Sequence, residues 1–213
     1  MTLSRTIHSD KASDAILLVV SAPSGAGKTT VCRKLLNMVP GLHFSVSYTT
    51  RHPRKGEVDG KDYYFISKEE FHTRMAAGEF AEWAENYGNM YGTSLKEIGH
   101  SLERQRDVLL DIDPRGAHAI KTNYPNGVFV FILPPSLAVL KQRLVGRGSE
   151  CQDIINMRFE KAVDEINEAL WYDYVIFNDV IDNSVDILRS IYIAEKNKRR
   201  RVENKIQTLH RRR

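Results

Sequence analysis

The chain has 213 residues, 42% hydrophobic and 27% charged with a net charge of +4, which indicates an ordinary globular chain of one compact domain. No segment reaches the roughly 18 uncharged apolar residues of a membrane span, and residues 1–15 lack the apolar stretch of a secretory signal, so we expect neither a membrane protein nor a secreted one. The two cysteines, Cys32 and Cys151, have neither metal-ligand spacing nor a disulfide pattern, which favours a reducing cytoplasm.

The first predicted elements are a strand, a glycine-containing loop and a helix. The apolar run at 16–20 is typical of a buried strand, and from 31 onward apolar residues are spaced as on a helix. Between them, Ala-Pro-Ser-Gly-Ala-Gly-Lys-Thr at 22–29 matches the phosphate-binding pattern G-x-x-x-x-G-K-[ST], except that Ala22 replaces the first glycine. Backbone N–H groups, the helix dipole and Lys28 would hold a phosphate, and the Thr29 hydroxyl would hold Mg²⁺. We therefore expect a nucleoside triphosphate site rather than a tight turn with an incidental lysine.

Residues 44–92 depart from the alternation of buried strands and helices. Segments at 44–48, 63–66 and 80–84 alternate or cluster aromatic residues as half-buried strands do. One short helix, at 68–77, is predicted among them. We interpret this region as a small mixed β insertion in an α/β core.

A loop in the insertion carries Arg51 and Arg54 on either side of a proline. Two guanidinium groups held in this way make bidentate contacts to a phosphate dianion, which lysines do not reproduce. On a surface such a pair is usually only solvated. Here an acid, a phenol and a hydroxyl follow in the strand-like segments at 82–85 and 88–93, which favours a phosphate-binding role.

Beyond the insertion, strands and helices alternate again. The alternation predicts a parallel sheet covered by helices on both faces. The arginine-bearing, glycine-punctuated segment at 143–158 has the composition of a mobile lid between helices. The strands are predicted at 108–112, 128–133 and 174–177, and the helices at 94–105, 114–122, 136–145 and from 182 onward.

The positive charge is concentrated at the C-terminal end. Residues 196–213 contain nine lysines and arginines and one acid, which leaves 22 basic and 26 acidic residues in 1–195, a net charge of −4. A basic run of this kind could contact RNA or an anionic surface. We expect a solvated extension of the last helix instead, so nucleic-acid binding is not expected and, if present, would lie in this tail.

Eight short motifs follow one another along most of the chain. They are Ala-Pro-Ser-Gly-Ala-Gly-Lys at 22–28, Ser-x-Thr-Thr-Arg-x-Pro-Arg at 47–54, Gly-Glu-Val-x-Gly at 56–60, Tyr-Gly-Thr-Ser at 91–94, Leu-Asp-Ile-Asp at 110–113, Pro-Pro-Ser at 134–136, Leu-x-Gly-Arg-Gly at 144–148 and Asn-Asp at 178–179. On these motifs the chain resembles the guanylate kinases from about residue 16 to 194. It departs from their pattern at Pro114 and Arg115, where an aromatic residue and a glutamine are usual.

The resemblance implies a cytoplasmic, Mg²⁺-dependent kinase that transfers the γ-phosphoryl group of ATP to GMP, giving ADP and GDP, in purine nucleotide metabolism and GMP recycling. It leaves the oligomeric state open, a homo-oligomer included. The fold it implies is a P-loop NTPase-type α/β domain with a parallel sheet. That domain spans 14–195, with a core at 14–45, 94–140 and 160–195, a GMP-binding insertion at 46–93 and a helical lid at 141–159, followed by the basic tail at 196–213.

The resemblance also implies a role for each matching residue. ATP would be bound by Ala22, Pro23, Ser24, Gly25, Ala26, Gly27, Lys28, Thr29 and Asn178, with Thr29 also contacting the Mg²⁺ bound to ATP. The GMP phosphate would be held by Ser47, Arg51, Arg54, Tyr63 and Tyr91, and guanine by Glu82 and Thr93 with Asp111 or Asp113 assisting. Catalysis of the transfer would fall to Lys28, Arg54, Arg143, Arg147 and Arg158.

Glu82 suits guanine on chemical grounds as well. The N1–H and 2-amino groups of guanine are adjacent donors that one carboxylate can accept, whereas adenine presents a lone pair at N1 and would be repelled. Thr93 could donate to O6. Without the ordered motifs, both side chains would be interpreted as solvated strand residues, and the motifs reverse that interpretation.

Two other functions remain open at this point. A guanylate-kinase-like interaction domain binds protein ligands without catalysis, but such domains typically lose the lysine that this chain keeps as Lys28. The other is a kinase for a different nucleotide, with the tail as an RNA-binding accessory. A panel of phosphate acceptors offered with ATP would separate the three.

Overall fold

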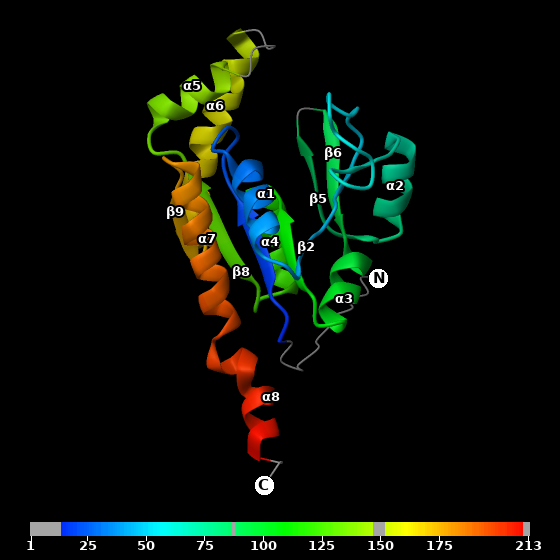
Figure 1. The fold of residues 1–213 in the computed structure, drawn as a ribbon. Helices are drawn as coiled ribbons and strands as arrows, with labels where there is room; N and C mark the ends of the chain where they lie inside the picture. The colour runs from blue at the N-terminus through cyan, green and yellow to red at the C-terminus, as the bar shows by residue number, and fades with distance from the viewer. Residues whose placement is uncertain (1–13, 87, 147–151, 211–213) are drawn as a thin grey trace.

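The centre of the molecule is a parallel sheet of five strands (Figure 1). The computed structural model describes residues 14–86, 88–146 and 152–210. The strand order is β2-β7-β1-β8-β9, and every neighbouring pair is parallel, which confirms the predicted α/β class. The strands are β1 (Leu17–Ser21), β2 (Leu42–Phe44), β7 (Asp107–Asp111), β8 (Val128–Leu133) and β9 (Tyr174–Phe177).

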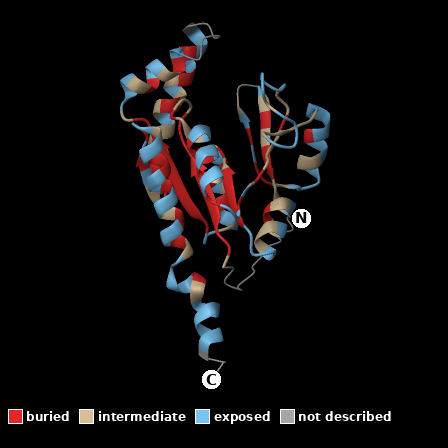
Figure 2. Ribbon diagram, in the orientation of Figure 1, coloured by how far each residue is buried: buried red, intermediate tan, exposed pale blue. Residues whose placement is uncertain are grey.

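Helices cover both faces of this sheet, so its central strands are apolar on both sides (Figure 2). Leu18 and Val20 of β1 pack with α1 and α7 on one face. Leu17 and Val19 pack with α3, α4 and η1 on the other. These helices are α1 (Lys28–Met38), α3 (Leu95–Glu103), α4 (Pro114–Asn123), the 3-10 helix η1 (Asn167–Trp171) and α7 (Ile181–Lys196).

The start of α4 explains how the chain accommodates Pro114. Asp113 precedes the helix as its N-cap, and its Oδ1 accepts a hydrogen bond of 2.8 Å from the backbone N–H of Gly116. Pro114 takes the first helical position, where a missing N–H costs nothing because that group has no partner within the helix. The departure at Pro114 therefore suits a helix start.

A second, mixed sheet lies beside the core, with strand order β4-β3-β6-β5. Its β3 and β4 are parallel, whereas β6 is antiparallel to both β3 and β5. This confirms the predicted mixed β structure. Its elements are β3 (Tyr48–Thr49), β4 (Tyr64–Phe65), α2 (Lys68–Ala76), β5 (Phe80–Asn86) and β6 (Asn89–Ser94).

The predicted single strand at 44–48 is wrong, because the chain changes sheets within it. Phe44 ends β2 and pairs with Leu109 in the core, whereas Tyr48 begins β3 and pairs with Gly92 in the second sheet. The residues between them alternate apolar and polar side chains like a strand. Period-two patterning therefore continues through the crossing and does not mark the change of partner.

The predicted lid segment is also different from expectation. From the composition we expected 143–158 to lie between helices, but Arg143 belongs to α5 (Leu137–Val145) and Arg158 to α6 (Gln152–Ile166), so the segment is helical at both ends, as the resemblance implied. The apolar side chains of α6 pack on α5 at Leu140 and Leu144. The glycines before α6 favoured the prediction of a loop, although apolar residues with helical spacing follow in α6.

The basic tail forms its own helix, α8 (Arg199–His210), at the end of the molecule opposite α5 and α6. The expectation that the tail is only solvated is wrong for Arg201, which is buried. Its Nη1 donates to the carbonyl oxygen of Ala15 at 2.9 Å and its Nη2 to that of Asn126 at 3.0 Å. Arg201 therefore joins α8 to the residues before β1 and β8. No helix among the described residues is long and apolar enough to cross a membrane.

We expect Arg201→Ala to lower the free energy of unfolding by about 2 kcal/mol, because the buried carbonyl group of Ala15 and the carbonyl group of Asn126 lose a charged donor. Arg199→Ala is the matched control on the same helix, since the Arg199 side chain is 80% exposed. Urea unfolding followed by circular dichroism measures both. Equal stability of the two variants would contradict the anchoring role of Arg201.

Candidate active site

The loop between β1 and α1 depends on two glycines. Gly25 and Gly27 have φ angles of +91° and +95°, in the left-handed region that favours glycine. A methyl group on Gly27 would also lie 2.4 Å from Nδ2 of Asn178. Ala22 has no such requirement, since Gln105 is the one described non-glycine residue with a positive φ. Alanine is therefore compatible with the first position of the loop.

Lys28 follows the loop as the first residue of α1. Its Nζ forms an ion pair of 2.7 Å with Oδ1 of Asp111 and donates a hydrogen bond of 2.6 Å to the carbonyl oxygen of Ile112. Burial alone would lower the pKa of Lys28, but the charge and hydrogen bond of Asp111 outweigh it and raise the pKa above its ordinary value. The ammonium group therefore stays charged beside the loop.

Two arginines from α5 and α6 contact the same loop. Arg143 donates from Nη1 to the carbonyl oxygen of Ala26 at 3.3 Å. Arg158 is buried and donates from Nη2 to the Ser24 hydroxyl at 2.9 Å. The third predicted arginine, Arg147, lies outside the described residues. Arg143 and Arg158 therefore place two positive charges against the loop.

Asn178 supports the loop from the end of β9. Its buried Nδ2 donates to the carbonyl oxygen of Ala26 at 2.7 Å, and its Oδ1 accepts a bond of 3.0 Å from the Ser184 hydroxyl. Its own carbonyl accepts from Nη2 of Arg143 at 3.0 Å. Asn178 therefore connects the loop with α5 and α7, and its expected place near adenine stays a prediction.

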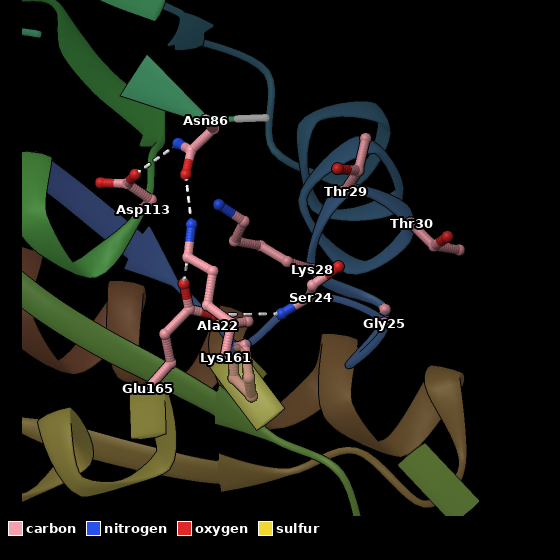
Figure 3. A pocket seen from close by; sticks show the side chains of 12 residues that line it. Ala22, Ser24, Gly25, Lys28, Thr29, Thr30, Asn86, Asp113, Lys161 and Glu165 are labelled. Atoms are coloured by element: carbon pink, nitrogen blue, oxygen red, sulfur yellow. Dashed lines mark hydrogen bonds and ion pairs between the residues drawn. The ribbon is translucent and has the colours of Figure 1, made fainter. Parts of the chain in front are cut away.

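A pocket opens beside the loop (Figure 3). The loop and the first turn of α1 form one side, and side chains from β5, the start of α4 and α6 form the other. The residues that line it are Ala22, Pro23, Ser24, Gly25, Gly27, Lys28, Thr29, Thr30, Asn86, Asp113, Lys161 and Glu165.

A chain of polar contacts crosses this pocket. The Ser24 backbone N–H donates to Oε2 of Glu165 at 3.3 Å, and Nζ of Lys161 lies 3.7 Å from Oε1 of Glu165. Lys161 also donates to Oδ1 of Asn86, whose Nδ2 donates to Oδ2 of Asp113 at 2.7 Å. Helix α6 is thereby connected to the loop on one side and to the second sheet on the other.

Sequence reasoning missed three of these residues: Asn86, Lys161 and Glu165. Arg158, Lys161 and Glu165 have the spacing i, i+3, i+7, which places them on one face of a helix. A helix prediction at 152–166 would therefore have found two of them from the arginine. Asn86 gives no comparable signal, because a polar residue at the end of a strand is ordinary.

Of the predicted phosphate ligands, Tyr63 and Tyr91 lie near Arg51 beside the second sheet, whereas Ser47 contacts Thr93. Nη1 and Nη2 of Arg51 bind the two carboxylate oxygens of Glu57 at 2.9 and 3.0 Å, and these bonds lower the pKa of Glu57. The guanidinium carbon of Arg51 lies 5.4 Å from the ring centre of Tyr63, which is 6.0 Å from that of Tyr91. Arg54 has an exposed side chain, and its backbone N–H donates to Glu57 at 2.7 Å.

Glu82 and Thr93 form a buried polar pair across β5 and β6, where they are register partners. The Thr93 hydroxyl donates to Oε1 of Glu82 at 2.5 Å and lies 3.2 Å from the hydroxyl of Ser47. Burial raises the pKa of Glu82 to about 7, with a contribution from the charge of Asp113, against the opposing effects of Thr93 and Lys28. This carboxyl is therefore poised between its neutral and ionised forms near neutral pH.

The two aspartates considered for guanine have different partners. Asp111 pairs with Lys28, whereas Asp113 caps α4 and accepts from Asn86. Asp113 is also the one whose charge contributes to the raised pKa of Glu82. The structure thus places Asp113 on the side of the Glu82–Thr93 pair.

The arrangement suits a reaction between two phosphorylated ligands. The loop, Lys28, Arg143 and Arg158 offer donors and positive charge for a polyphosphate. The second sheet offers a buried acceptor and hydroxyls for a polar ring. Asn86 of β5 and Lys28 line the same pocket, which connects the second sheet with the loop.

Comparison with known proteins gives a consistent result. The family model described as guanylate kinase matches residues 14–195. The chain is 50% identical to the guanylate kinase of Geobacter metallireducens, over 86% of this chain and 90% of that protein. It is 53% identical to that of Syntrophus aciditrophicus, over 89% and 91%. Among solved structures, guanylate kinase from Anaplasma phagocytophilum matches with a TM-score of 0.75 and 37% identity, over 89% of this chain and 90% of that one.

Proposed function

Because this chain belongs to the guanylate kinase family, we propose that it transfers the γ-phosphoryl group of ATP to GMP, giving ADP and GDP. It is a nucleoside monophosphate kinase, and the product would serve purine nucleotide metabolism and GMP recycling. The observation that carries the proposal is the combination of two features: a glycine loop that ends in charged Lys28, and a buried Glu82–Thr93 pair on β5 and β6, with Asn86 of β5 lining the same pocket as the loop.

On the ATP side, the backbone N–H groups of 22–29 would cradle the phosphates, and Lys28 would neutralise charge on the transferred group. Arg143, Arg147 and Arg158 would add positive charge from the lid. Asn178, buried under the loop, would keep it in shape for ATP. The protein then contributes position and charge, which is what phosphoryl transfer requires.

On the GMP side, Glu82 would accept hydrogen bonds from N1–H and the 2-amino group of guanine, and Thr93 would assist, with Asp113 favoured over Asp111 as the second acid. The phosphate would be held by Ser47, Arg51, Arg54, Tyr63 and Tyr91. Arg51 would bind the phosphate either in place of Glu57 or together with it.

The residues present suit Mg²⁺. Thr29 is exposed on the first turn of α1 and lines the pocket beside Lys28, and the Asp111 carboxylate lies at the end of the adjacent strand. Hydroxyl and carboxylate oxygens are ligands that Mg²⁺ prefers, together with the phosphates of ATP. Thr29 would hold the ion, which would neutralise phosphate charge when bound.

We further propose the division into a core (14–45, 94–140 and 160–195), a GMP-binding region (46–93), a lid (141–159) and the tail (196–213). ATP and GMP would be the ligands, and nucleic acid would have no part in the reaction. The absence of a cysteine pattern and the choice of substrates favour the cytoplasm.

A panel of GMP, IMP, AMP, CMP and UMP, each with ATP and Mg²⁺, tests the function. We expect GMP to be the best acceptor and AMP to be negligible. Turnover with none of them would favour an interaction domain, and preference for another monophosphate would favour a different kinase. Either result would overturn the proposal.

The raised pKa of Glu82 predicts a pH dependence. The Glu82 carboxyl must be ionised to accept two hydrogen bonds from guanine. We therefore expect kcat/KM for GMP to be low at acidic pH and to rise with pH, with its midpoint at about 7. The GMP phosphate also changes charge in this range, because the second pKa of a phosphate monoester is about 6. Glu82→Gln separates these two ionisations. In the variant, the rise of kcat/KM near pH 7 should be absent, and the change caused by the GMP phosphate should remain. A midpoint that is the same in both proteins would contradict the assignment to Glu82.

A further inference from the structure

The Glu82 carboxylate lies directly against a glycine on the first turn of α4. A methyl group built on Gly116 would be 2.4 Å from Oε2 and 2.9 Å from Cδ of Glu82. Both distances are below 3.0 Å, a separation from other heavy atoms that Cβ atoms essentially never show. The same methyl would lie 3.4 Å from Oδ1 of Asp113, which is an ordinary contact. The clash is therefore with the carboxylate of Glu82 alone.

The backbone of α4 gives no other reason for a glycine here. Gly116 is a buried helical residue and is not among the described glycines with a positive φ. In such a position alanine is normally the better residue, because glycine pays more backbone entropy in a helix. The absence of a side chain is thus explained by the close approach of Glu82.

The carboxylate has little room to move away. Glu82 is 7% exposed, and its Oε1 is held by the hydroxyl of Thr93, which is completely buried. Thr93 in turn contacts Ser47. The carboxylate is therefore confined between β6 on one side and the first turn of α4 on the other.

We propose that Gly116 is a specificity-determining positioning residue: its missing side chain provides the space in which Glu82 is held to read guanine. This rests on the proposed function of Glu82. Gly116 touches neither substrate in this account and acts through the carboxylate. A methyl group at 116 would displace Oε2 and misalign the two bonds to N1–H and the 2-amino group.

The test is Gly116→Ala, with Gly99→Ala as the matched control. Gly99 also lies in a helix, α3, and a methyl there would meet nothing within 4 Å. We expect Gly116→Ala to lower kcat/KM for GMP roughly 10- to 100-fold and to narrow the preference for GMP over IMP, with the KM for ATP unchanged. Gly99→Ala should leave all three unchanged and raise Tm slightly.

Glu82→Asp allows a double-mutant test of the coupling between residues 82 and 116. This test stays informative if Gly116→Ala folds poorly. Aspartate is shorter by one methylene, so its carboxylate would withdraw from a methyl at 116. Gly116→Ala should therefore have a much smaller effect in a Glu82→Asp background than in the wild type, in kcat/KM for GMP and in Tm. If Gly116→Ala lowers kcat/KM for GMP by the same factor in both backgrounds, the proposal is wrong.

The outcomes separate this inference from the function it rests on. If wild-type protein does not prefer GMP to IMP, the proposed function fails. If wild-type protein prefers GMP and Gly116→Ala keeps that preference at full activity, Gly116 does not position Glu82. Loss of ATP affinity together with GMP activity would mean a general structural role and would also overturn the proposal.

Discussion

Lys28→Ala is expected to lower kcat by on the order of 10²-fold or more, with GMP affinity close to that of the wild type. The ammonium group would neutralise charge that develops on the transferred phosphoryl group, so its loss affects the transition state more than the ground state. Steady-state kinetics gives kcat, and calorimetry gives the dissociation constant of GMP.

Two controls accompany this measurement. Lys34→Ala removes an exposed lysine from the same helix, paired with Asp182 at the surface, and should leave kcat unchanged. Tm must be measured for Lys28→Ala, because Asp111 loses its cation. Retained turnover in a folded Lys28→Ala protein would remove the loop lysine from the mechanism.

Glu82→Gln is expected to lower kcat/KM for GMP roughly 10- to 100-fold. The amide can still accept from Thr93 through Oε1, but its NH₂ would face a donor of guanine. Sites built to bond a polar group discriminate strongly against analogues that lack it. The variant should therefore narrow the GMP-to-IMP ratio, since IMP lacks only the 2-amino group. AMP should remain negligible for the wild type.

Kinetics with GMP, IMP and AMP above neutral pH, where Glu82 is ionised, makes this comparison. Glu85→Gln is the matched control, because Glu85 lies on the same strand with an exposed side chain. If Glu82→Gln keeps the full preference for GMP over IMP, guanine is read elsewhere, and Asp113 or Asp111 becomes the better candidate.

The loop around Lys28 was predictable because the loop and the two elements beside it are contiguous in the sequence. The strand, the two glycines and the helix start lie within residues 17–28, and left-handed backbone at Gly25 and Gly27 suits the glycines of the motif. No tertiary contact was needed to predict the loop. The partner of Lys28 was less accessible, since Asp111 comes from a strand on the far side of the insertion.

The second half of the site depends on register and on distant contacts. Glu82 and Thr93 were both expected at guanine, but their direct bond follows from the pairing of β5 with β6. Lys161 reaches Asn86 across 75 residues of sequence, which no local pattern encodes. Arg201 was misjudged for a similar reason: a basic run predicts solvation, and burial came from carbonyl groups far away along the chain.

The order of strands in the core has a consequence for biosynthesis. β1 is made first, yet it lies between β7 and β8, and the Ile16 backbone N–H donates to Asp107 across 91 residues. At typical translation speeds roughly 5 to 20 s separate the two. During that interval the apolar strand that carries the phosphate loop has neither of its neighbours, whereas β5 and β6 can pair as soon as they emerge. The second sheet is therefore able to form before the core sheet, and during that interval the nascent β1 needs protection from aggregation.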